Sequence, residues 1–227
     1  MISFEPLVEP AINYITNLFV HHGFRMIDRN FTKLSDVKFK LNPARVKIDP
    51  EFQYPEWLEK FKFFGMMEIE KDYSLRQVRL SMKSSRPAKF WNDLVNSPKK
   101  FEAAVKPIED IDVEKEKSGK EYWTFDWDMP MMEINTKALK TSLPESKGIN
   151  LRSISGDIKN SEWLFTSRPY GPKGSSMVNL QVHGHFEGSS WLLTNMIKKN
   201  PIANHGVNVM SGFVILSSME AYGTKPE

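Results

Sequence analysis

The chain contains no cysteine. This absence excludes disulfide bonds, thiolate catalysis, and zinc or iron–sulfur sites that depend on cysteine ligands. Long hydrophobic runs are missing too, because no segment reaches the ~18 apolar residues that a membrane-spanning helix needs. Residues 1–10 include Glu5, Glu9 and two prolines but no basic stretch followed by an apolar one, so no signal peptide is recognised. We therefore expect a cytoplasmic protein.

A strong charge of either sign is also missing. The 31 basic and 28 acidic residues give a net charge of +3, and the lysines are scattered along the chain. A dedicated nucleic-acid-binding domain normally carries a basic stripe, so we expect no nucleic-acid partner. The sequence has no Gly-x-Ser-x-Gly motif, phosphate-binding glycine loop or His-Glu-x-x-His motif. We therefore predict no catalytic residue, no cofactor and no metal site.

What the sequence does contain is a regular succession of amphipathic segments. Its 227 residues, 40% of them hydrophobic, can form one large domain, or one domain with an extension. Apolar residues at helical spacing predict helices over residues 5–22 and 55–67. Alternation predicts a strand over residues 76–82, and prolines near a helix start predict two short helices over residues 87–95 and 97–105. Further strands are predicted over residues 108–115, 121–128, 132–141, 149–155, 162–168 and 177–186, and the chain ends in helix from residue 191 onward.

Several short motifs follow the same order. Residues 86–95 read Arg-Pro-Ala-Lys-Phe-Trp-Asn-Asp-Leu-Val, and residues 112–114 read Asp-Val-Glu. Residues 155–158 read Ser-Gly-Asp-Ile, residues 163–165 read Trp-Leu-Phe, and residues 191–201 lead into a long helix. In this order and spacing the motifs resemble the START-like (SRPBCC) superfamily, which includes lipid-transfer domains, pollen-allergen-like proteins, polyketide cyclases and aromatases.

The resemblance covers residues 68–222 and implies an α+β, helix-grip fold, in which a curved antiparallel sheet wraps around a long C-terminal helix. Residues 1–67 are then a helical or irregular N-terminal extension, and residues 223–227 are a tail. The resemblance also implies an internal cavity that binds or transfers an apolar small molecule such as a lipid, sterol or quinone. The sequence does not indicate the oligomeric state.

Two alternatives to simple binding remain open at this point. One is a cyclase- or dehydrase-like enzyme that uses the same pocket, with Arg152, Asn179 and His183 as the polar residues able to face inward. The other is a transient membrane contact through residues 5–22, whose apolar face has few basic residues beside it. Binding without catalysis is favoured, because an apolar guest is held by burial alone.

The cavity wall is predicted from the inward phase of the strands and the last helix. Each of these residues is alternatively part of a filled core. Small and polar residues of the last helix, including Asn208 and Gly212, leave room for a guest, or Gly212 merely lets a strand approach closely. The predicted wall residues are Trp123, Phe125, Trp127, Met132, Trp163, Phe165, Leu180, Met210, Ser211 and Phe213.

Two pairs of ionisable residues share a strand face but predict no site. His183 and His185 are two residues apart and could bind a metal together with a carboxylate, but no third ligand is identifiable. The alternative is that the two histidines simply lie on an outward face of the sheet, where alternate polar residues are common. Asp126 and Asp128 lie opposite the tryptophans of their strand, on a solvated face where paired carboxylates have no reason to differ in pKa. We expect both aspartates to be inert charges.

Overall fold

The computed structural model describes residues 24–26, 46, 54, 56, 58–69, 75–129, 132–144, 147–185 and 201–223. No helix in these ranges is both long and apolar enough to cross a membrane. The elements are β1 (Phe24–Met26), β2 (Phe63–Ile69), β3 (Leu75–Ser84), α2 (Ala88–Val95), α3 (Pro98–Ala104), β4 (Ile108–Lys115), β5 (Glu121–Met129), β6 (Met132–Ser142), β7 (Gly148–Gly156), β8 (Glu162–Pro169), β9 (Ser176–His183) and α5 (Pro201–Ala221).

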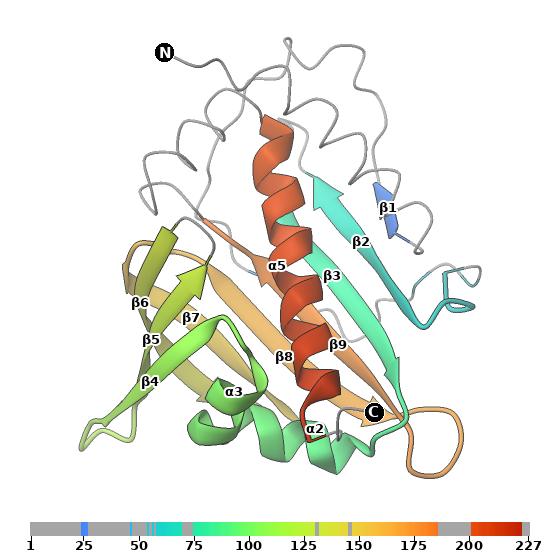
Figure 1. Ribbon diagram of the computed structural model, residues 1–227, viewed down its shortest axis with the longest axis horizontal. Coiled ribbons are helices and arrows are strands. Elements are labelled where there is room, and N and C mark those ends of the chain that lie inside the picture. Colours follow the sequence, from blue (N-terminus) through green and yellow to red (C-terminus); the bar gives the residue numbers. More distant parts are fainter. Residues whose placement is uncertain are drawn as a thin grey trace.

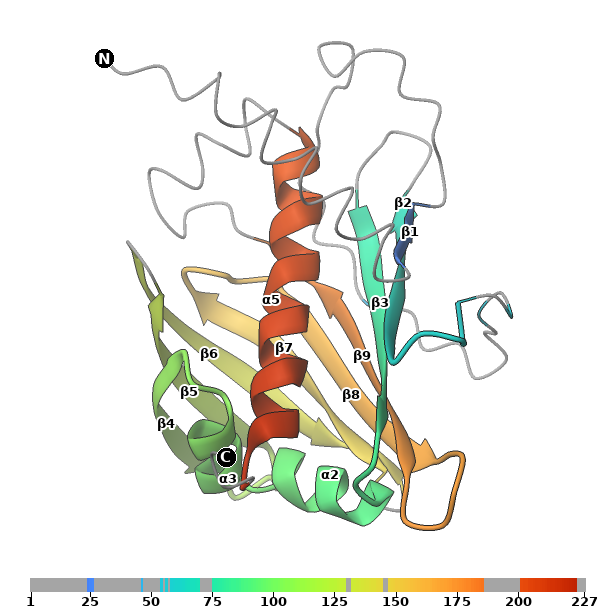
Figure 2. The same ribbon diagram turned by 45° about the vertical axis from the view of Figure 1, so that its right-hand side comes forward.

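The strands form one curved sheet in the order β1-β2-β3-β9-β8-β7-β6-β5-β4. Strands β1 and β2 run parallel, and every other neighbouring pair is antiparallel. Figure 1 and Figure 2 show that the concave side of the sheet faces α5, while α2 and α3 lie together across one end of it. The predicted α+β helix-grip arrangement is confirmed.

The two short helices begin where their prolines predicted. Pro87 directly precedes α2, and Pro98 is in the first turn of α3, where a missing N–H costs no helical hydrogen bond. Trp91 and Leu94 of α2 and Phe101 of α3 are buried in the main core. Helices α2 and α3 therefore close one end of the sheet by burying their apolar faces against it.

The helix predicted over residues 55–67 is wrong where it meets the sheet, because Phe63–Ile69 is strand β2. The spacing of apolar residues in this segment fits a helix. Residues 63–67, however, contain no polar residue and include a glycine. Such a run is typical of a strand that is buried on both faces. Strand β2 also crosses the predicted boundary at residue 67, so the sheet starts inside the segment predicted to be an extension.

Both faces of β2 are indeed covered. On the concave side the ring of Phe63 packs edge-to-face against Phe213 of α5, with 4.9 Å between ring centroids. On the convex side Phe64 is buried in a second, smaller apolar cluster with Leu58 and Met177. The predicted helices over residues 5–22 and 191–199, and all but the first residue of the tail, lie outside the described residues.

Polar side chains next to this second cluster are buried on the convex side as well. Ser81 Oγ shares a hydrogen bond of 2.9 Å with the Tyr54 hydroxyl and donates to Asn179 Oδ1 at 2.6 Å. Arg79, only 4% exposed, forms an ion pair with Glu68. Tyr54 therefore joins the segment before β2 to strands β3 and β9 through a hydrogen-bonded network.

Tyr54 makes the stability of this network dependent on alkaline pH. Burial raises the pKa of Tyr54 from 10.0 to about 12, and the hydrogen bond with Ser81 opposes only part of the shift. The folded state therefore favours the neutral phenol, whose contribution is complete below pH ~10 and is lost as the pH rises toward 12. We expect the Tyr54→Phe variant to lose less unfolding free energy than the unmodified chain between about pH 10 and pH 11. Urea denaturation at both pH values measures this, and equal losses in the two proteins would contradict the assignment.

Candidate functional site

Helix α5 identifies the concave face of the sheet. A Cβ atom added at Gly212 would collide with Leu80 Cδ1 and lie 3.6 Å from Leu180 Cδ2, so glycine allows α5 to approach β3 and β9 closely. In the strand register Leu80 is opposite Leu180, and Leu180 is opposite Phe165. Because cross-strand partners share a face, the concave face continues from β3 through β9 to β8. The interpretation that Gly212 permits close packing of a strand is confirmed.

An aromatic cluster packs on the concave side near the end that α2 and α3 close. The ring centroid of Phe101 lies 6.0 Å from that of Trp123, 6.2 Å from that of Phe125 and 5.5 Å from that of Phe165. Each of these four side chains, like Leu180, is at most 2% exposed. Side chains without accessible surface have neighbours on every side, so this part of the predicted wall is packed to core density. Trp163, at 6% exposure, is nearly as buried.

Trp127 differs from the other aromatic residues of β5. Its side chain is half-buried, and its ring centroid lies 5.8 Å from that of Phe125. Its Nε1 is buried and has no hydrogen-bond partner among the described residues, whereas Trp123 Nε1 donates to Glu121 Oε1 at 2.7 Å. The Trp127 side chain thus keeps accessible apolar surface on the concave face. The side chain of Met132, the next predicted wall residue along the chain, lies outside the described residues.

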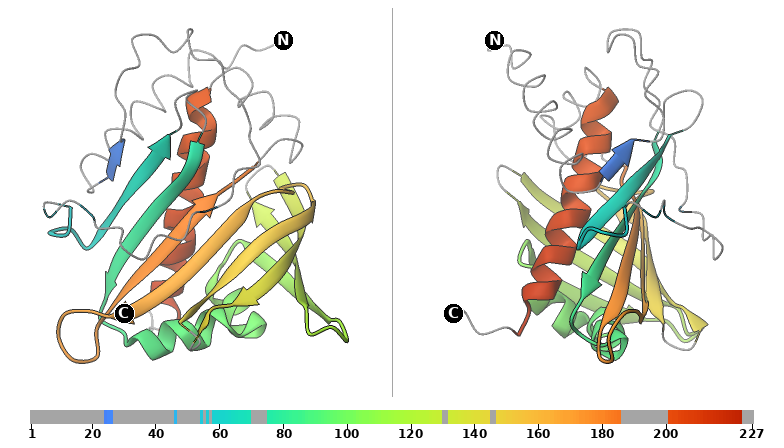
Figure 3. Two further views of the ribbon diagram at one scale, coloured as in Figure 1. Left: turned by 180° about the vertical axis from the view of Figure 1, so that it is seen from behind. Right: turned by 90° about the vertical axis from the view of Figure 1, so that its right-hand side faces the viewer.

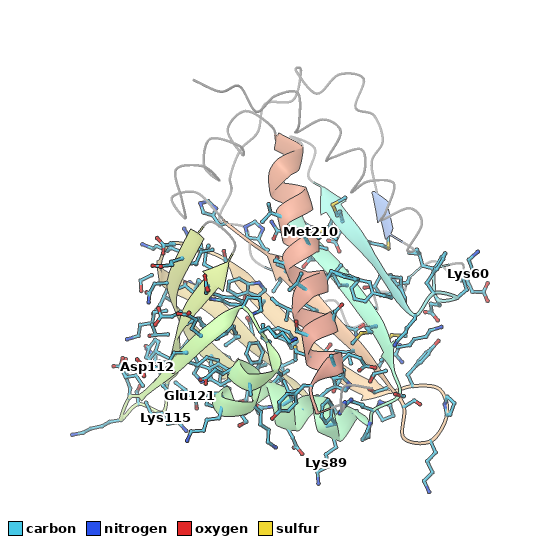
Figure 4. All side chains as sticks on the ribbon, viewed as in Figure 1. Lys60, Lys89, Asp112, Lys115, Glu121 and Met210 are labelled. Carbon is cyan, nitrogen blue, oxygen red and sulfur yellow. The ribbon has the colours of Figure 1, made fainter. Side chains whose placement is uncertain are left out.

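The three predicted wall residues of α5 lie on different flanks of the helix. Ser211 and Phe213 are each rotated about 100° from Gly212, in opposite directions. Because Phe213 packs against Phe63 of β2, Ser211 faces the other half of the sheet, toward β8 and β5. Met210, labelled on α5 in Figure 4, is rotated about 160° from Gly212. All three side chains are half-buried.

A buried amide fastens α5 to the end of β9. Asn208 is fully buried, its Oδ1 accepts a hydrogen bond from the Gly184 N–H, and its Nδ2 donates to the Gly184 carbonyl oxygen at 3.2 Å. The side chain thus satisfies both backbone groups of one residue, as a neighbouring strand would. Among the polar residues of the last helix, Asn208 therefore holds the helix in place and does not leave room beside it.

A charged pair beneath Trp123 was not predicted. Lys140 Nζ lies 3.6 Å from Glu121 Oε1 and 5.7 Å from the centroid of the Trp123 ring. Burial pushes the pKa of Glu121 up, but the hydrogen bond from Trp123 and the charges of Lys140 and Lys115 outweigh it, so the pKa is below its ordinary value. Figure 4 shows Glu121 and Lys115 beside the β4–β5 hairpin, far from Met210. The sequence could have indicated this contact, because Glu121 is two residues before Trp123 on the same strand and therefore shares its face.

The polar residues considered for catalysis lie on the convex face. On β9, Asn179 and His183 alternate with the concave-facing Leu180, and Asn179 accepts its hydrogen bond from Ser81 on the convex side. His183 Nδ1 donates to the carbonyl oxygen of Arg76 at 2.8 Å. Arg152 of β7 is likewise out of phase with its concave-facing neighbours Leu151 and Ser153, which are buried while Arg152 is half-buried. The expectation that these residues could face inward is wrong.

The two pairs of ionisable residues have different outcomes. His183 lies on the outward, convex face of the sheet, but both His183 and His185 are buried, because that face is covered there. In the part of the chain that the structure describes, no group of three His, Asp or Glu side chains could hold a metal ion. Asp126 and Asp128 are exposed, as predicted.

Comparisons by sequence find no relative. No family model matches the chain, and no curated protein matches its sequence.

Comparisons by structure do find the same architecture. The chain is similar to TTHA0849 from Thermus thermophilus (TM-score 0.51, 15% identity, 63% of this chain and 94% of that one). It is similar to the Zhui aromatase/cyclase from Streptomyces sp. R1128 (TM-score 0.51, 11% identity, 64% and 94%). A START superfamily protein from Mycobacterium smegmatis also matches (TM-score 0.50, 15% identity, 65% and 99%). Such low identities carry no function across, but together with the strand order and the position of α5 they show that this chain has the START-like, helix-grip fold.

Proposed function

We propose that this protein binds an apolar small molecule, such as a lipid, sterol or quinone, between the concave face of the sheet and α5. The guest is held by removal of apolar surface from water, at about 25 cal/mol per Å². No covalent chemistry is needed, and release into another apolar environment would make the protein a carrier.

The observation that carries this proposal is a contrast within the concave face. Around Phe101 the aromatic side chains are fully buried against one another. Trp127 and, on α5, Ser211 are only half-buried, although they lie on the inner side of a curved sheet. Helix α5 packs mainly on β3 and β9, so the aromatic half of the sheet faces the flank of α5 with the small serine. Apolar surface with a small residue opposite it is the composition expected of a binding site.

The positions of the polar residues favour binding over catalysis. An enzyme of the cyclase or dehydrase kind needs polar groups that converge on the guest. Asn179 and His183 make their hydrogen bonds on the convex side, to Ser81 and to the Arg76 carbonyl oxygen. One solved neighbour carries the name aromatase/cyclase and another the name START superfamily protein, so the fold alone accommodates different activities. The positions of Asn179 and His183 support the carrier interpretation.

A substitution that fills the space beside α5 tests the proposal. We expect native mass spectrometry and organic extraction of the purified protein to reveal a bound apolar molecule, and the Ser211→Phe variant to lose it. For the emptied protein, we expect Ser211→Phe to weaken binding of the fluorescent probe 1-anilinonaphthalene-8-sulfonate by about tenfold or more, because the added ring occupies the guest's place.

The matched control is Ser217→Phe on the same helix. Ser217 is also half-buried, but it is rotated by about 120° from Ser211 around the helix axis. This variant should keep the guest and the probe affinity. Equal loss in both variants would show a general effect on folding, and a chain with neither guest nor probe binding would contradict the proposal.

A further inference from the structure

The indole N–H of Trp127 is a buried hydrogen-bond donor without a partner among the described residues. An indole can only donate, and a tryptophan N–H that is out of reach of water usually finds an acceptor. Trp123, two residues earlier on the same face of β5, has such an acceptor, because its Nε1 donates to Glu121 Oε1 at 2.7 Å. The described part of the chain therefore supplies an acceptor to one tryptophan of this face and none to the other.

Trp91 of α2 also has a buried Nε1 that is unpaired within the described ranges, but the two tryptophans differ in access. The Trp91 side chain is 1% exposed and packs edge-to-face against Phe90, with 5.6 Å between ring centroids. Trp127 is half-buried, so part of its ring on the concave face is accessible. A guest on the concave face can therefore contact the ring of Trp127, whereas that of Trp91 is enclosed in the core.

The strand neighbours of Trp127 on the concave face are apolar. Trp127 is opposite Ile108 of β4 and Ile134 of β6. Figure 3, in its left-hand view, shows β4, β5 and β6 at the edge of the sheet opposite β1 and β2, so those strands are farther away. The next residue on this face of β6 is Thr136, which is fully buried and whose hydroxyl donates to the Ser155 carbonyl oxygen at 3.0 Å. An acceptor carried by the guest would complete what these neighbours leave open.

The charges around Trp127 favour an uncharged acceptor. Asp126 and Asp128 flank it on β5, and Glu133 of β6 is opposite Asp128. All three carboxylates are exposed, and residues 125–136 contain no lysine or arginine. A carboxylate on the guest would be buried here without a cation and repelled by its surroundings, and both effects are unfavourable.

A carbonyl oxygen fits this single donor better than a hydroxyl group does. The carbonyl accepts a hydrogen bond and brings no donor of its own. An alcohol would bring an additional O–H, which the apolar neighbours Ile108 and Ile134 cannot accept. A buried donor left without an acceptor is unfavourable, so the alcohol replaces one unpaired group with another.

We propose that Trp127 Nε1 donates a hydrogen bond to an uncharged carbonyl oxygen of the guest. This inference rests on the proposed function, because it names the chemical class of the molecule held beside α5. The preferred guest is then an apolar ketone, ester or quinone, rather than a hydrocarbon, an alcohol or a free fatty acid. A site that hydrogen-bonds one group of its ligand discriminates against analogues that lack the group.

Four compounds with one tricyclic skeleton test the choice of oxygen: 9-fluorenone, fluorene, 9-fluorenol and fluorene-9-carboxylate. In displacement of 1-anilinonaphthalene-8-sulfonate from the emptied protein, we expect 9-fluorenone to bind about tenfold more tightly than fluorene, and more tightly than the alcohol and the carboxylate. Trp127→Phe keeps an aromatic ring but removes the N–H, so the ratio of ketone to hydrocarbon affinity should fall to about one. Trp91→Phe is the same change at the enclosed tryptophan and should leave this ratio as it is.

NMR of protein with ¹⁵N-labelled indoles gives a readout that does not depend on affinity. Of the six tryptophan side-chain signals, the one missing from Trp127→Phe should move downfield with 9-fluorenone and not with fluorene. An unchanged affinity ratio in Trp127→Phe, a ratio lost only in Trp91→Phe, or tighter binding of the alcohol or the carboxylate overturns the proposal. If 1-anilinonaphthalene-8-sulfonate binds but 9-fluorenone does not, this inference fails and the apolar site stands. If neither binds, the proposed function fails as well.

Discussion

Replacing Phe101 with alanine should lower the free energy of unfolding by about 3–5 kcal/mol, the range for removing a buried aromatic side chain. Phe101 contacts Trp123, Phe125 and Phe165, which come from two strands on different parts of the sheet. Its removal leaves a space that none of these large rings can fill without leaving its rotamer. Denaturant unfolding followed by tryptophan fluorescence measures the loss, and we expect the melting temperature to fall by roughly 10 °C.

The matched control is Phe90→Ala on the neighbouring helix α2. Phe90 is half-buried and has one aromatic contact, with Trp91 at 5.6 Å between ring centroids. We expect less than half of the loss seen with Phe101→Ala, about 1–2 kcal/mol. Similar losses for the two variants would show that the aromatic cluster around Phe101 is loosely packed, contrary to its burial.

The Asn208→Leu variant should lose about 2–4 kcal/mol of unfolding free energy. Leucine is the apolar residue closest in shape to asparagine, so the main effect is on hydrogen bonding. The Gly184 N–H and carbonyl oxygen both bond to the Asn208 side chain, and each buried group left unsatisfied costs about 1–3 kcal/mol. Amide hydrogen exchange gives a local readout, because the Gly184 N–H should lose protection more than the amides of the sheet.

Ser211→Ala, within the same turn of α5, is the control for Asn208→Leu. Ser211 Oγ donates to the carbonyl oxygen of Asn208 at 3.1 Å, and this oxygen is already within the hydrogen-bonding pattern of the helix. Its removal should change the unfolding free energy by less than about 0.5 kcal/mol. If Asn208→Leu is equally mild, or leaves the Gly184 amide protected, the amide side chain does not fasten α5 to β9.

Much of the sheet and both short helices were predictable from hydrophobic alternation and from proline positions. In these segments the pattern in the sequence matches the burial of each face in the folded protein. Strand β5 alternates aromatic and polar residues, and its inward and outward faces are truly different, with Trp123 buried and Asp126 exposed. Pro87 and Pro98 marked the starts of α2 and α3 by removing backbone donors where none is needed.

Hydrophobic alternation failed to predict a strand where both faces of the strand are covered. Strand β2 packs against α5 through Phe63 and against the convex cluster through Phe64, so it has no polar face to reveal its period. The facing of Asn179 and His183 was missed for the same reason. The convex side of β9 is covered by residues such as Tyr54, so polar and apolar residues are buried on opposite sides of the same strand. Which side a buried polar residue faces depends on partners far away in the sequence.

The candidate site was predictable in outline only. The inward phase of Trp123, Phe125 and Trp127 follows from alternation, but their different burial depends on Phe101, which a separate helix supplies. The rotation of Ser211 and Phe213 to opposite flanks of α5 follows from helix geometry once the position of Gly212 against Leu80 is known.

The pairing of β3 with β9 has a consequence for the chain as it leaves the ribosome. Ser81 and Asn179, which hydrogen-bond across these strands, are 98 positions apart. Strands β4 to β8 each pair with the strand that follows in the sequence, so this part of the sheet can form as the chain emerges. The β2–β3 hairpin, in contrast, gains its neighbour only when β9 has emerged. At a synthesis rate of about 5–20 residues per second, its apolar faces stay uncovered for several seconds. Nascent chains stalled just before residue 176 should therefore recruit chaperones more strongly than chains stalled after residue 221.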